Sequence, residues 1–457
     1  MPDEKVYIYH TNDIHSNLTF WPRIAQELQN KRAIHEQKGE DVFVFDIGDA
    51  TDRVNPLTEA TNGQAITELL NEGKYDGVTI GNNEGITNSK EELNHLYKKA
   101  KFPVILTNLF DLETEKYPEW ATPYQVFKTK NNDRIGVFGL TTPLYETYEK
   151  LGWKITDPLT QIQQFFVKHE EEADFWILLS HLGIETDRII SKTYPISLII
   201  GAHTHHVLLN GERSAGSILT GAGQFGRWIG EVVLTRKHGR LEVETAGLIN
   251  VETDVPAPRA ETKIVNDYIN YGHHLLKNET IAYLSTPLSA NWYTQTALAD
   301  VTLQAIADFV GTDRAILNAG LFMEDLKRGV VTADDLHQCL PHPIRVMQCK
   351  IKGYHLLEFE EEIDRVNQKM SHQPVRGFGF RGEVFGKLCL KGFNENQRIN
   401  PNEDYELATI DYFSFLSFFD TLNTYSTQEI IFPDFLRGVV GNYLAKTYPL
   451  KNRIENN

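Results

Sequence analysis

The chain of 457 residues is 41% hydrophobic and 23% charged, and its formal net charge at pH 7 is −17. This length predicts two or three domains, and the composition is typical of a soluble globular protein. No apolar run reaches the roughly eighteen residues that a membrane-spanning helix needs, so we expect no contact with a membrane. The acidic charge argues against a nucleic-acid-binding surface, because phosphate backbones attract basic patches. An anionic ligand would therefore need local positive charge, which metal ions could supply.

The N-terminus and the cysteines both indicate a reducing compartment. Residues 1–5 carry no basic segment followed by an apolar stretch, so we expect no signal peptide and a cytoplasmic location. The three cysteines, Cys339, Cys349 and Cys389, are widely spaced and form no CxxC motif, which predicts that they are reduced and buried. Any metal ion must then be held by His, Asp and Asn.

Short apolar strands alternate with amphipathic segments over residues 1–251. After a first strand that begins at Val6, the pattern predicts strands at 41–46, 75–80, 103–107, 134–140, 174–180 and 196–200. Helical spacing occurs at 20–37, 59–72, 89–100 and 157–172, and residues 216–250 predict further strands with a hairpin turn at Gly239. Alternation of this kind predicts an α/β domain with a largely buried sheet.

A composition change follows this domain. Residues 252–280 read as a linker with two prolines followed by one bridging helix, and residues 281–457 as a second domain. That domain mixes predicted helices (294–310, 353–366, 433–446) with predicted strands (345–351, 384–390, 404–411), so we expect an α+β class.

Polar side chains follow five of the predicted strands. Asp13 and His15 stand two residues apart, and because alternate residues of a strand face opposite ways, they can converge only if the chain turns there. The other four strand ends supply Asp49, Asn82, His181, and the pair His203 and His205. The carboxyl ends of strands in an α/β sheet share one edge, where ligands bind. Any one histidine could be an ordinary core or surface residue, but the combination predicts a metal site.

Seven nitrogen and oxygen ligands suit two divalent ions, with Asp49 as the shared carboxylate. Two ions about 3.5–4 Å apart can activate a bridging water and neutralise a phosphoryl group during in-line attack. The pattern therefore favours hydrolysis of a phosphate ester. Asp, Asn and His accept manganese, zinc, iron or cobalt, so the metal stays open.

The order of these motifs resembles the five signature blocks of the calcineurin-like metallophosphoesterases. The blocks are Asp13-x-His15, Gly48-Asp49, Gly81-Asn82-x-Glu84, His181 and His203-x-His205. The approach His10-Thr11-Asn12 and the long C-terminal half resemble the 5′-nucleotidase family, which includes UDP-sugar hydrolases and cyclic-nucleotide phosphodiesterases. The resemblance implies an N-terminal four-layer αββα sandwich of two mixed sheets between helices. It also implies one ion held by Asp13, His15, Asp49 and His205, and another held by Asp49, Asn82, His181 and His203.

The third block departs from the family. Its histidine, which stabilises the transition state or protonates the leaving group, is replaced here by Asn83, and Ile86 stands where its partner Asp would fall. An amide can donate a hydrogen bond but cannot shuttle a proton near pH 7. Either His10 or His206 substitutes in space, or the substrate has a good leaving group, or catalysis is slow. A cytoplasmic, YunD-like branch of the family is similar in carrying this Asn.

The second domain is similar to the family's C-terminal substrate-binding domain. Leu317-Asn318-Ala319-Gly320 matches its Asn-Gly-Gly turn, although the arginine expected soon after is absent and His342 replaces a stacking Phe. The resemblance implies that Asn318, Gly320 and Asp420 bind the substrate, and Tyr412 or Phe415 could stack on a base, although the aromatic residues here could equally be core. Arg381 borders a glycine-rich turn and could bind a phosphate, or it could be an ordinary surface arginine.

The sequence thus predicts a dimetal phosphoesterase that acts on nucleotides or nucleotide-like phosphate esters, with Asn83 and His206 contacting the phosphoryl group. One alternative is a phosphodiesterase or pyrophosphatase acting on substrates with good leaving groups. Another is a catalytically weak nucleotide or metal sensor. We expect a small-molecule phosphate as partner and no nucleic-acid polymer, and the sequence does not predict the oligomeric state.

Overall fold

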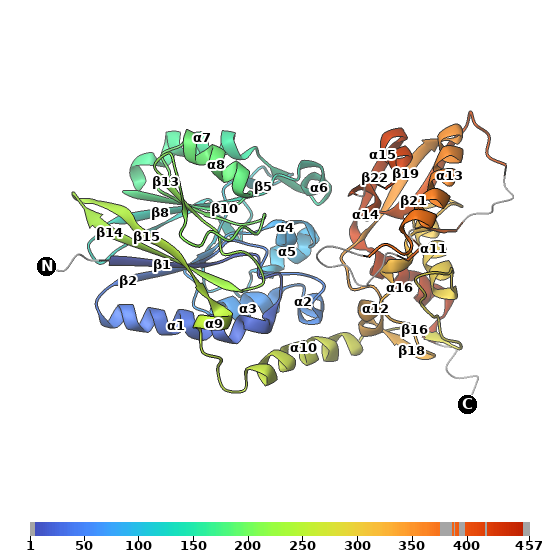
Figure 1. The fold of residues 1–457 in the computed structure, drawn as a ribbon, viewed down its shortest axis with the longest axis horizontal. Helices are drawn as coiled ribbons and strands as arrows, with labels where there is room; N and C mark the ends of the chain where they lie inside the picture. Colours follow the sequence, from blue (N-terminus) through green and yellow to red (C-terminus); the bar gives the residue numbers. More distant parts are fainter. Residues whose placement is uncertain (1–4, 375–385, 388, 393–397, 416–417, 451–457) are drawn as a thin grey trace. The chain divides into compact units, whose positions relative to one another are not determined.

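The computed structural model describes residues 5–374, 386–387, 389–392, 398–415 and 418–450, the side chain of Phe415 excepted (Figure 1). The chain divides into two compact units, Met1–Gly272 and His273–Asn457. The domain limits expected from the sequence stay predictions.

Two mixed sheets form the centre of the first unit. The seven-stranded sheet has the order β15-β14-β1-β2-β3-β4-β6 and the six-stranded sheet the order β12-β13-β11-β10-β8-β7. The first consists of β1 (Lys5–Thr11), β2 (Asp41–Asp46), β3 (Gly77–Val78), β4 (Val104–Ile105), β6 (Ala121–Thr122), β14 (Trp228–Lys237) and β15 (Arg240–Asn250). The second consists of β7 (Tyr124–Lys128), β8 (Arg134–Thr141), β10 (Phe175–His181), β11 (Leu198–Gly201), β12 (Glu212–Ser214) and β13 (Ser217–Thr220). Strands β1, β2, β3, β4 and β6 run parallel, as do β8, β10, β11 and β13.

Helices cover the outer face of each sheet (Figure 1). Helices α1 (Trp21–Gln37) and α3 (Gln64–Glu72) lie along the seven-stranded sheet, and α7 (Pro158–His169) and α8 (Ile184–Thr193) lie along the six-stranded one. The remaining elements of this unit are shorter, apart from α10: α2 (Pro56–Thr61), α4 (Asn82–Ile86), α5 (Lys90–Leu96), α6 (Tyr145–Lys150), α9 (Val251–Asp254), α10 (Glu261–Lys277), and the paired strands β5 (Leu109–Asp111) and β9 (Trp153–Ile155). The four-layer sandwich expected from the family resemblance is therefore confirmed.

The alternation of β10 shows how the layers are held together. Phe175, Ile177 and Leu179 belong to the buried cluster between the two sheets. Trp176 and Leu178 point the other way, into a second cluster that includes residues of α7 and α8. Because both faces of the strand are buried, its sequence reads as a continuous apolar run, as it does in sheets covered on both sides.

One predicted helix is broken by left-handed backbone. The expected helix at 59–72 is two helices, α2 and α3, because Asn62 and Gly63 have φ angles of 48° and 79°. The Asn62 N–H caps α2 by bonding to the Glu59 carbonyl. A left-handed residue of this kind ends a helix, and Asn and Gly adopt that conformation most readily.

The second unit is an α+β domain, as expected. It contains a three-stranded antiparallel sheet in the order β21 (Asp404–Ile410), β19 (Arg345–Lys352) and β22 (Ser426–Phe435). It also contains two separate strand pairs, β16 (Thr280–Leu284) with β18 (Gly329–Thr332) and β17 (Ile316–Leu317) with β20 (Leu390–Lys391). Its helices are α11 (Ala297–Val310), α12 (Ala333–Cys339), α13 (Gly353–Met370), α14 (Tyr412–Phe415), α15 (Asp420–Tyr425) and α16 (Leu436–Thr447).

The core of this unit contains all three cysteines, which are buried as predicted and form no disulfide among the described residues. The helix expected at 433–446 begins only at Leu436, because residues up to Phe435 pair with β19. Part of the strand expected at 384–390 lies outside the described residues, and the strand observed there is Leu390–Lys391.

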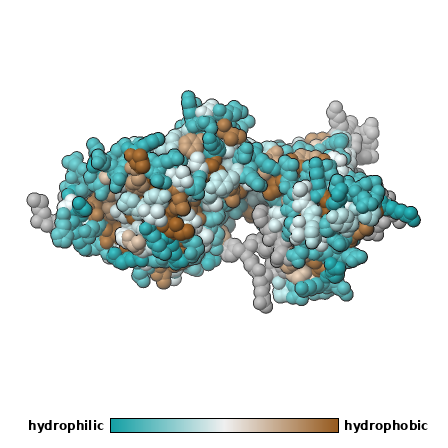
Figure 2. Space-filling model, turned by 90° about the horizontal axis from the view of Figure 1, so that it is seen from above, coloured by the Kyte–Doolittle hydropathy of each residue, from teal (hydrophilic) through white to brown (hydrophobic). Residues whose placement is uncertain are grey.

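No helix in the described part of the chain is both long and apolar enough to cross a membrane. On the face shown in Figure 2, hydrophilic residues cover most of the surface and hydrophobic ones form scattered small patches.

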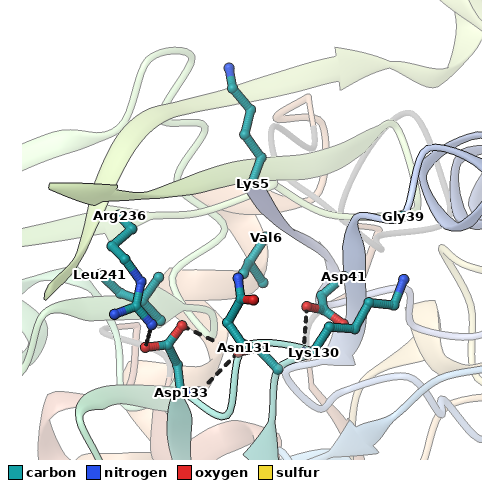
Figure 3. A pocket seen from close by; sticks show the side chains of 10 residues that line it. Lys5, Val6, Gly39, Asp41, Lys130, Asn131, Asp133, Arg236 and Leu241 are labelled. Atoms are coloured by element: carbon teal, nitrogen blue, oxygen red, sulfur yellow. Dashed lines mark hydrogen bonds and ion pairs between the residues drawn. The ribbon is translucent and has the colours of Figure 1, made fainter. Parts of the chain in front are cut away.

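One hollow opens at the amino ends of β1, β2 and β8 (Figure 3). Its volume is about 10 Å³, which holds about one water molecule. Arg236 pairs with Asp133 there, so charged side chains close this end of the sandwich.

Candidate metal centre

The chain turns sharply where the predicted ligands lie. Asp13, His15, Asp49, His203 and His205 all have φ angles between 49° and 73°, in the left-handed region. Left-handed backbone costs a non-glycine residue on the order of 1 kcal/mol or more and persists only where the surroundings impose it. The turn that the Asp13-x-His15 spacing requires is therefore present, and it recurs at the ends of β2 and β11.

Asp13, His15 and His205 form the first group of candidate metal ligands. Oδ1 of Asp13 lies 3.5 Å from Nε2 of His205 and 3.9 Å from Nε2 of His15. The two Nε2 atoms are 3.3 Å apart. The donor atoms of this group lie within 4.8 Å of one another, a spacing that one ion can bridge.

The second group consists of Asp13, Asp49 and His181. Nε2 of His181 is 3.4 Å from Oδ2 of Asp49 and 4.0 Å from Oδ1 of Asp13. Oδ2 of Asp49 also lies 3.9 Å from Nε2 of His15. Both carboxylates thus lie between the two sets of histidines, so either could be shared by two ions.

Asn82 and His203 complete the cluster. Nδ1 of His203 is 2.9 Å from Oδ1 of Asn82, and the His203 ring lies 5.3 Å from the ring of His181. The His203 N–H also donates to the Asp13 carboxylate at 3.2 Å. All seven residues predicted as ligands therefore gather at the carboxyl edge of the sheets.

The buried charges in this cluster are strongly coupled. Burial opposes charge on His181, but the nearby Asp49 carboxylate outweighs it and raises the pKa of His181 to about 10. Burial likewise opposes charge on Asp49, and the histidines reverse that effect and lower the pKa of Asp49 to about 2. An ion ligated by Nε2 of His181 would take the place of the proton that the raised pKa favours on this ring.

The orientation of His181 fits a metal ligand. Its Nδ1 donates to the Ile47 carbonyl oxygen at 2.7 Å, while Nε2 is buried and has no hydrogen-bond partner among the described residues. A ring nitrogen that is fully buried and faces two carboxylates lacks only a cation. The donor set of carboxylate, imidazole and amide is one that divalent transition metals accept.

Glu84 organises the turn that carries Asp49. Its carboxylate accepts hydrogen bonds from the backbone N–H groups of Asp49 (2.9 Å), Thr51 (2.8 Å) and Gly81 (2.8 Å), and from the Thr51 hydroxyl. Burial and the nearby Asp49 charge raise the pKa of this carboxyl. Glu84 was not predicted to have a role, although an acid three residues after a strand-end glycine is at the position from which a helix N-terminus is capped.

Asn12 is a second residue whose supporting role was not predicted from the sequence. Its amide donates to Oδ2 of Asp13 at 2.7 Å and to the Gly223 carbonyl at 2.7 Å, and its Oδ1 accepts from the Ala222 N–H. These bonds join the first strand to a loop more than 200 residues later, so no local sequence signal identifies them.

Asn83 lies at the same edge, between two of the turns. Its backbone N–H donates to Oδ1 of Asp49 at 2.7 Å. Its side-chain amide lies 2.9 Å from Nδ1 of His15 and 3.1 Å from the Thr51 carbonyl oxygen.

The two histidines considered as substitutes for the missing acid differ in environment. His10 is fully buried against Gly230, and burial lowers its pKa to about 3, so the ring is neutral and enclosed. His206 is exposed, and its Nδ1 lies 2.9 Å from the Thr204 hydroxyl. Of the two, only His206 is accessible to a substrate.

The substrate residues expected in the second unit are only partly described. Asn318 is buried, with an Oδ1 that lacks a hydrogen-bond partner among the described residues, and Gly320 lies in the short 3-10 helix that follows. Tyr412 is half-buried at the start of α14, and Asp420 is exposed at the start of α15. Arg381 and the side chain of Phe415 lie outside the described residues.

Comparison with known proteins identifies both halves of the chain. Residues 6–207 match the family model described as calcineurin-like phosphoesterase, and residues 276–417 match the 5′-nucleotidase C-terminal domain. The fold and the cluster of candidate ligands define the class of protein as a metal-dependent phosphoric ester hydrolase. The chain belongs to the calcineurin-like phosphoesterases that carry a 5′-nucleotidase C-terminal domain.

Similar proteins extend over nearly the whole chain. The uncharacterized metallophosphoesterase YunD of Bacillus subtilis (strain 168) is 35% identical over 97% of this chain and 100% of its own length. Protein UshA of Yersinia enterocolitica is 22% identical over 97% of this chain and 92% of its own. The fold is similar to that of a putative 5′-nucleotidase from Staphylococcus aureus, with a TM-score of 0.64, 15% identity and 98% coverage of both chains.

Proposed function

We propose that this protein hydrolyses phosphate esters of nucleotides or nucleotide-like metabolites at a two-metal centre. One ion would be held by Asp13, His15, Asp49 and His205, and the other by Asp49, Asn82, His181 and His203. When bound, two such ions activate a water molecule and neutralise the charge of a phosphoryl group.

The observation that carries the proposal is the convergence of seven neutral or acidic ligands from five separate strand ends. The position of Asp49 supports its proposed role as the shared ligand, because its Oδ2 lies 3.9 Å from Nε2 of His15 and 3.4 Å from Nε2 of His181. Glu84 and Asn83 hold that carboxylate and its backbone through buried hydrogen bonds. These groups fix the ligand geometry in advance, so little reorganisation accompanies binding.

The nucleotide part of the proposal draws on the similar proteins and on the second unit. The S. aureus structure is described as a putative 5′-nucleotidase, and a relative from Naja atra is a snake venom 5′-nucleotidase. In this chain Asn318, Gly320, Arg381, Tyr412, Phe415 and Asp420 are the residues that we propose contact the substrate. An aromatic side chain such as Tyr412 offers a face on which a base can stack.

A phosphodiesterase or pyrophosphatase is the second candidate. It is favoured by the environment of the third signature block, where Asn83 faces His15 and Thr51 and the buried His10 cannot reach a leaving group. His206 is then the side chain that we propose contacts the phosphoryl group from the solvent side. A good leaving group needs no proton in the transition state, and a general acid is worth roughly 10²–10⁴-fold where one is needed. A catalytically weak nucleotide or metal sensor remains the third candidate.

Phosphate release by the purified protein with added Mn²⁺ tests the proposal. The substrates are nucleoside monophosphates, dinucleotides, nucleotide sugars and an activated aryl diester, each beside Asp49→Asn. Turnover of any of these that Asp49→Asn abolishes supports the dimetal hydrolase. Turnover of the diester or of a pyrophosphate alone favours the second candidate. Metal binding with no turnover favours the sensor.

We also propose a cytoplasmic location, which suits three reduced and buried cysteines. Fractionation of cells that express the tagged protein tests it.

A further inference from the structure

Both polar atoms of the Asn83 amide contact protein groups. Its Nδ2 lies within hydrogen-bond distance of Nδ1 of His15 and of the Thr51 carbonyl, and its Oδ1 accepts from Nδ2 of Asn82 at 3.3 Å. With its backbone N–H bound to Asp49, the residue touches the turns that follow β1, β2 and β3. Each polar atom of this side chain therefore has a protein partner within hydrogen-bond distance.

The contact with His15 has a specific consequence. A histidine can ligate an ion only through an unprotonated ring nitrogen, and the partner of the other nitrogen sets the tautomer and the plane of the ring. Nε2 of His15 faces Asp13, Asp49 and His205, which leaves Nδ1 as the orienting atom. Asn83 is its nearest partner, and Oδ2 of Asp52 lies further away at 3.8 Å.

A carboxamide suits this position because it can serve either tautomer. Its NH₂ group donates to an unprotonated Nδ1. When Nε2 ligates an ion, the neutral ring carries its proton on Nδ1, and the amide oxygen accepts that proton after a half-turn of the amide, which gives up the hydrogen bond from Nδ2 to Thr51.

We infer that Asn83 is a positioning residue that orients His15 for its metal ion and takes no part in proton transfer to the leaving group. This inference rests on the proposed function, because it concerns the same centre. The Asn that replaces the family's histidine would then act on a metal ligand. The sequence had led us to expect that Asn83 contacts the phosphoryl group.

Metal affinity is the measurement that tests this inference. Mn²⁺ binding is followed by calorimetry on the full chain, after removal of metal, for wild type, Asn83→Ala, Asn83→Asp and the surface control Asn94→Ala. Removal of a residue that orients a histidine ligand costs roughly 10–100-fold in metal affinity, so we expect that loss for one ion in Asn83→Ala. Asn83→Asp keeps an acceptor for Nδ1 and should bind within a few-fold of wild type. The side chain of Asn94 accepts from the indole N–H of Trp120 at the surface, and its variant should bind metal as wild type does.

A second readout follows the ring itself. In the Zn²⁺-loaded protein, the Nδ1 proton of His15, assigned with His15→Gln, should exchange with solvent faster in Asn83→Ala than in wild type. Unchanged affinity and exchange in a folded Asn83→Ala, with a lower kcat, would overturn the inference and leave the proposed function standing. A wild-type protein that binds no Mn²⁺ would overturn the proposed function itself.

Discussion

The ring of His181 is held by the carbonyl oxygen of Ile47, which accepts a hydrogen bond from Nδ1 at 2.7 Å. Ile47 follows β2 of one sheet and His181 ends β10 of the other, so this bond joins the two sheets at the edge where the candidate ligands lie. It also directs Nε2 toward Asp49. The position of the metal centre thus depends on the packing of one sheet on the other.

Removal of this ring should remove one ion. We expect His181→Ala to bind one Mn²⁺ in place of two, because His181 supplies a ligand to only one of the proposed sites. Calorimetric stoichiometry measures this, with His169→Ala at the end of α7 as control. A variant that still binds two ions with wild-type affinity would show that His181 is not a ligand.

Glu84→Gln should weaken both the fold and the centre. The amide NH₂ would face backbone N–H groups that now donate to a carboxylate oxygen, and an unsatisfied buried group costs about 1–3 kcal/mol. We expect a lower melting temperature and weaker Mn²⁺ binding, because Asp49 would lose its backbone support. Thermal unfolding and calorimetry measure the two effects.

The matched control is Glu92→Gln, in the next helix. Glu92 accepts from the Ser89 N–H at the start of α5 and pairs with Arg53, away from the candidate ligands. Its variant should lose some stability and keep its metal affinity. Equal losses of metal affinity in both variants would contradict a specific role for Glu84.

The sequence alone located the strand ends and the candidate ligands, because each is a local signal. A buried strand reads as an apolar run, and a polar residue with glycine beside it marks where the strand ends. The supporting residues were not predictable in that way. Asn12 bonds to residues 222 and 223, and Glu84 bonds to the turn after β2, so both contacts appear only once distant segments are brought together.

The second unit shows a different limit. An aromatic run at 412–419 is typical both of a stacking platform and of a core, and periodicity does not separate the two. Phe413 and Phe419 are fully buried and pack against each other, with ring centroids 5.0 Å apart. Tyr412 remains half-buried. Burial, which depends on the whole fold, decides which of these rings could meet a ligand.

Gly81→Ala should displace the shared carboxylate. An added Cβ would lie 2.1 Å from Oδ1 of Asp49, closer than any real contact. We expect loss of phosphate release and weaker Mn²⁺ binding, measured together on the same preparation. The control is Gly438→Ala in α16, where the added Cβ would meet no described atom within 4 Å beyond the backbone of its own helix and Ala favours the helix by about 1 kcal/mol. A Gly81→Ala protein as active as wild type would contradict the close approach of Gly81 to Asp49.

Asp187 should make stability depend on pH. It is fully buried beside the Ser180 hydroxyl, and burial raises its pKa from 3.8 to about 7. Because the folded-state pKa lies above the unfolded one, its contribution is complete below about pH 4 and is lost as pH rises through 7. That difference in pKa corresponds to at most about 4 kcal/mol.

Asp187→Asn removes this titration and leaves the shape of the side chain. We expect the variant to melt below wild type at pH 5 and the gap to narrow or reverse by pH 8.5, with both proteins measured in chelator so that metal binding does not contribute. A gap that is the same at both pH values would contradict the raised pKa.

The dependence of the rate on the leaving group tests whether His206 supplies a proton. It is the exposed histidine beside the ligand His205, and its Nδ1 contacts the Thr204 hydroxyl, which leaves Nε2 to face solvent or substrate. If His206 supplies the proton, His206→Ala should lower kcat for aryl phosphates with poor leaving groups by roughly 10²-fold or more, and should change little for those with good ones. The slope of log kcat against leaving-group pKa would then be steeper in the variant. The same slope in both proteins would mean that no side chain at this position assists departure, and it would favour substrates whose leaving groups depart as anions.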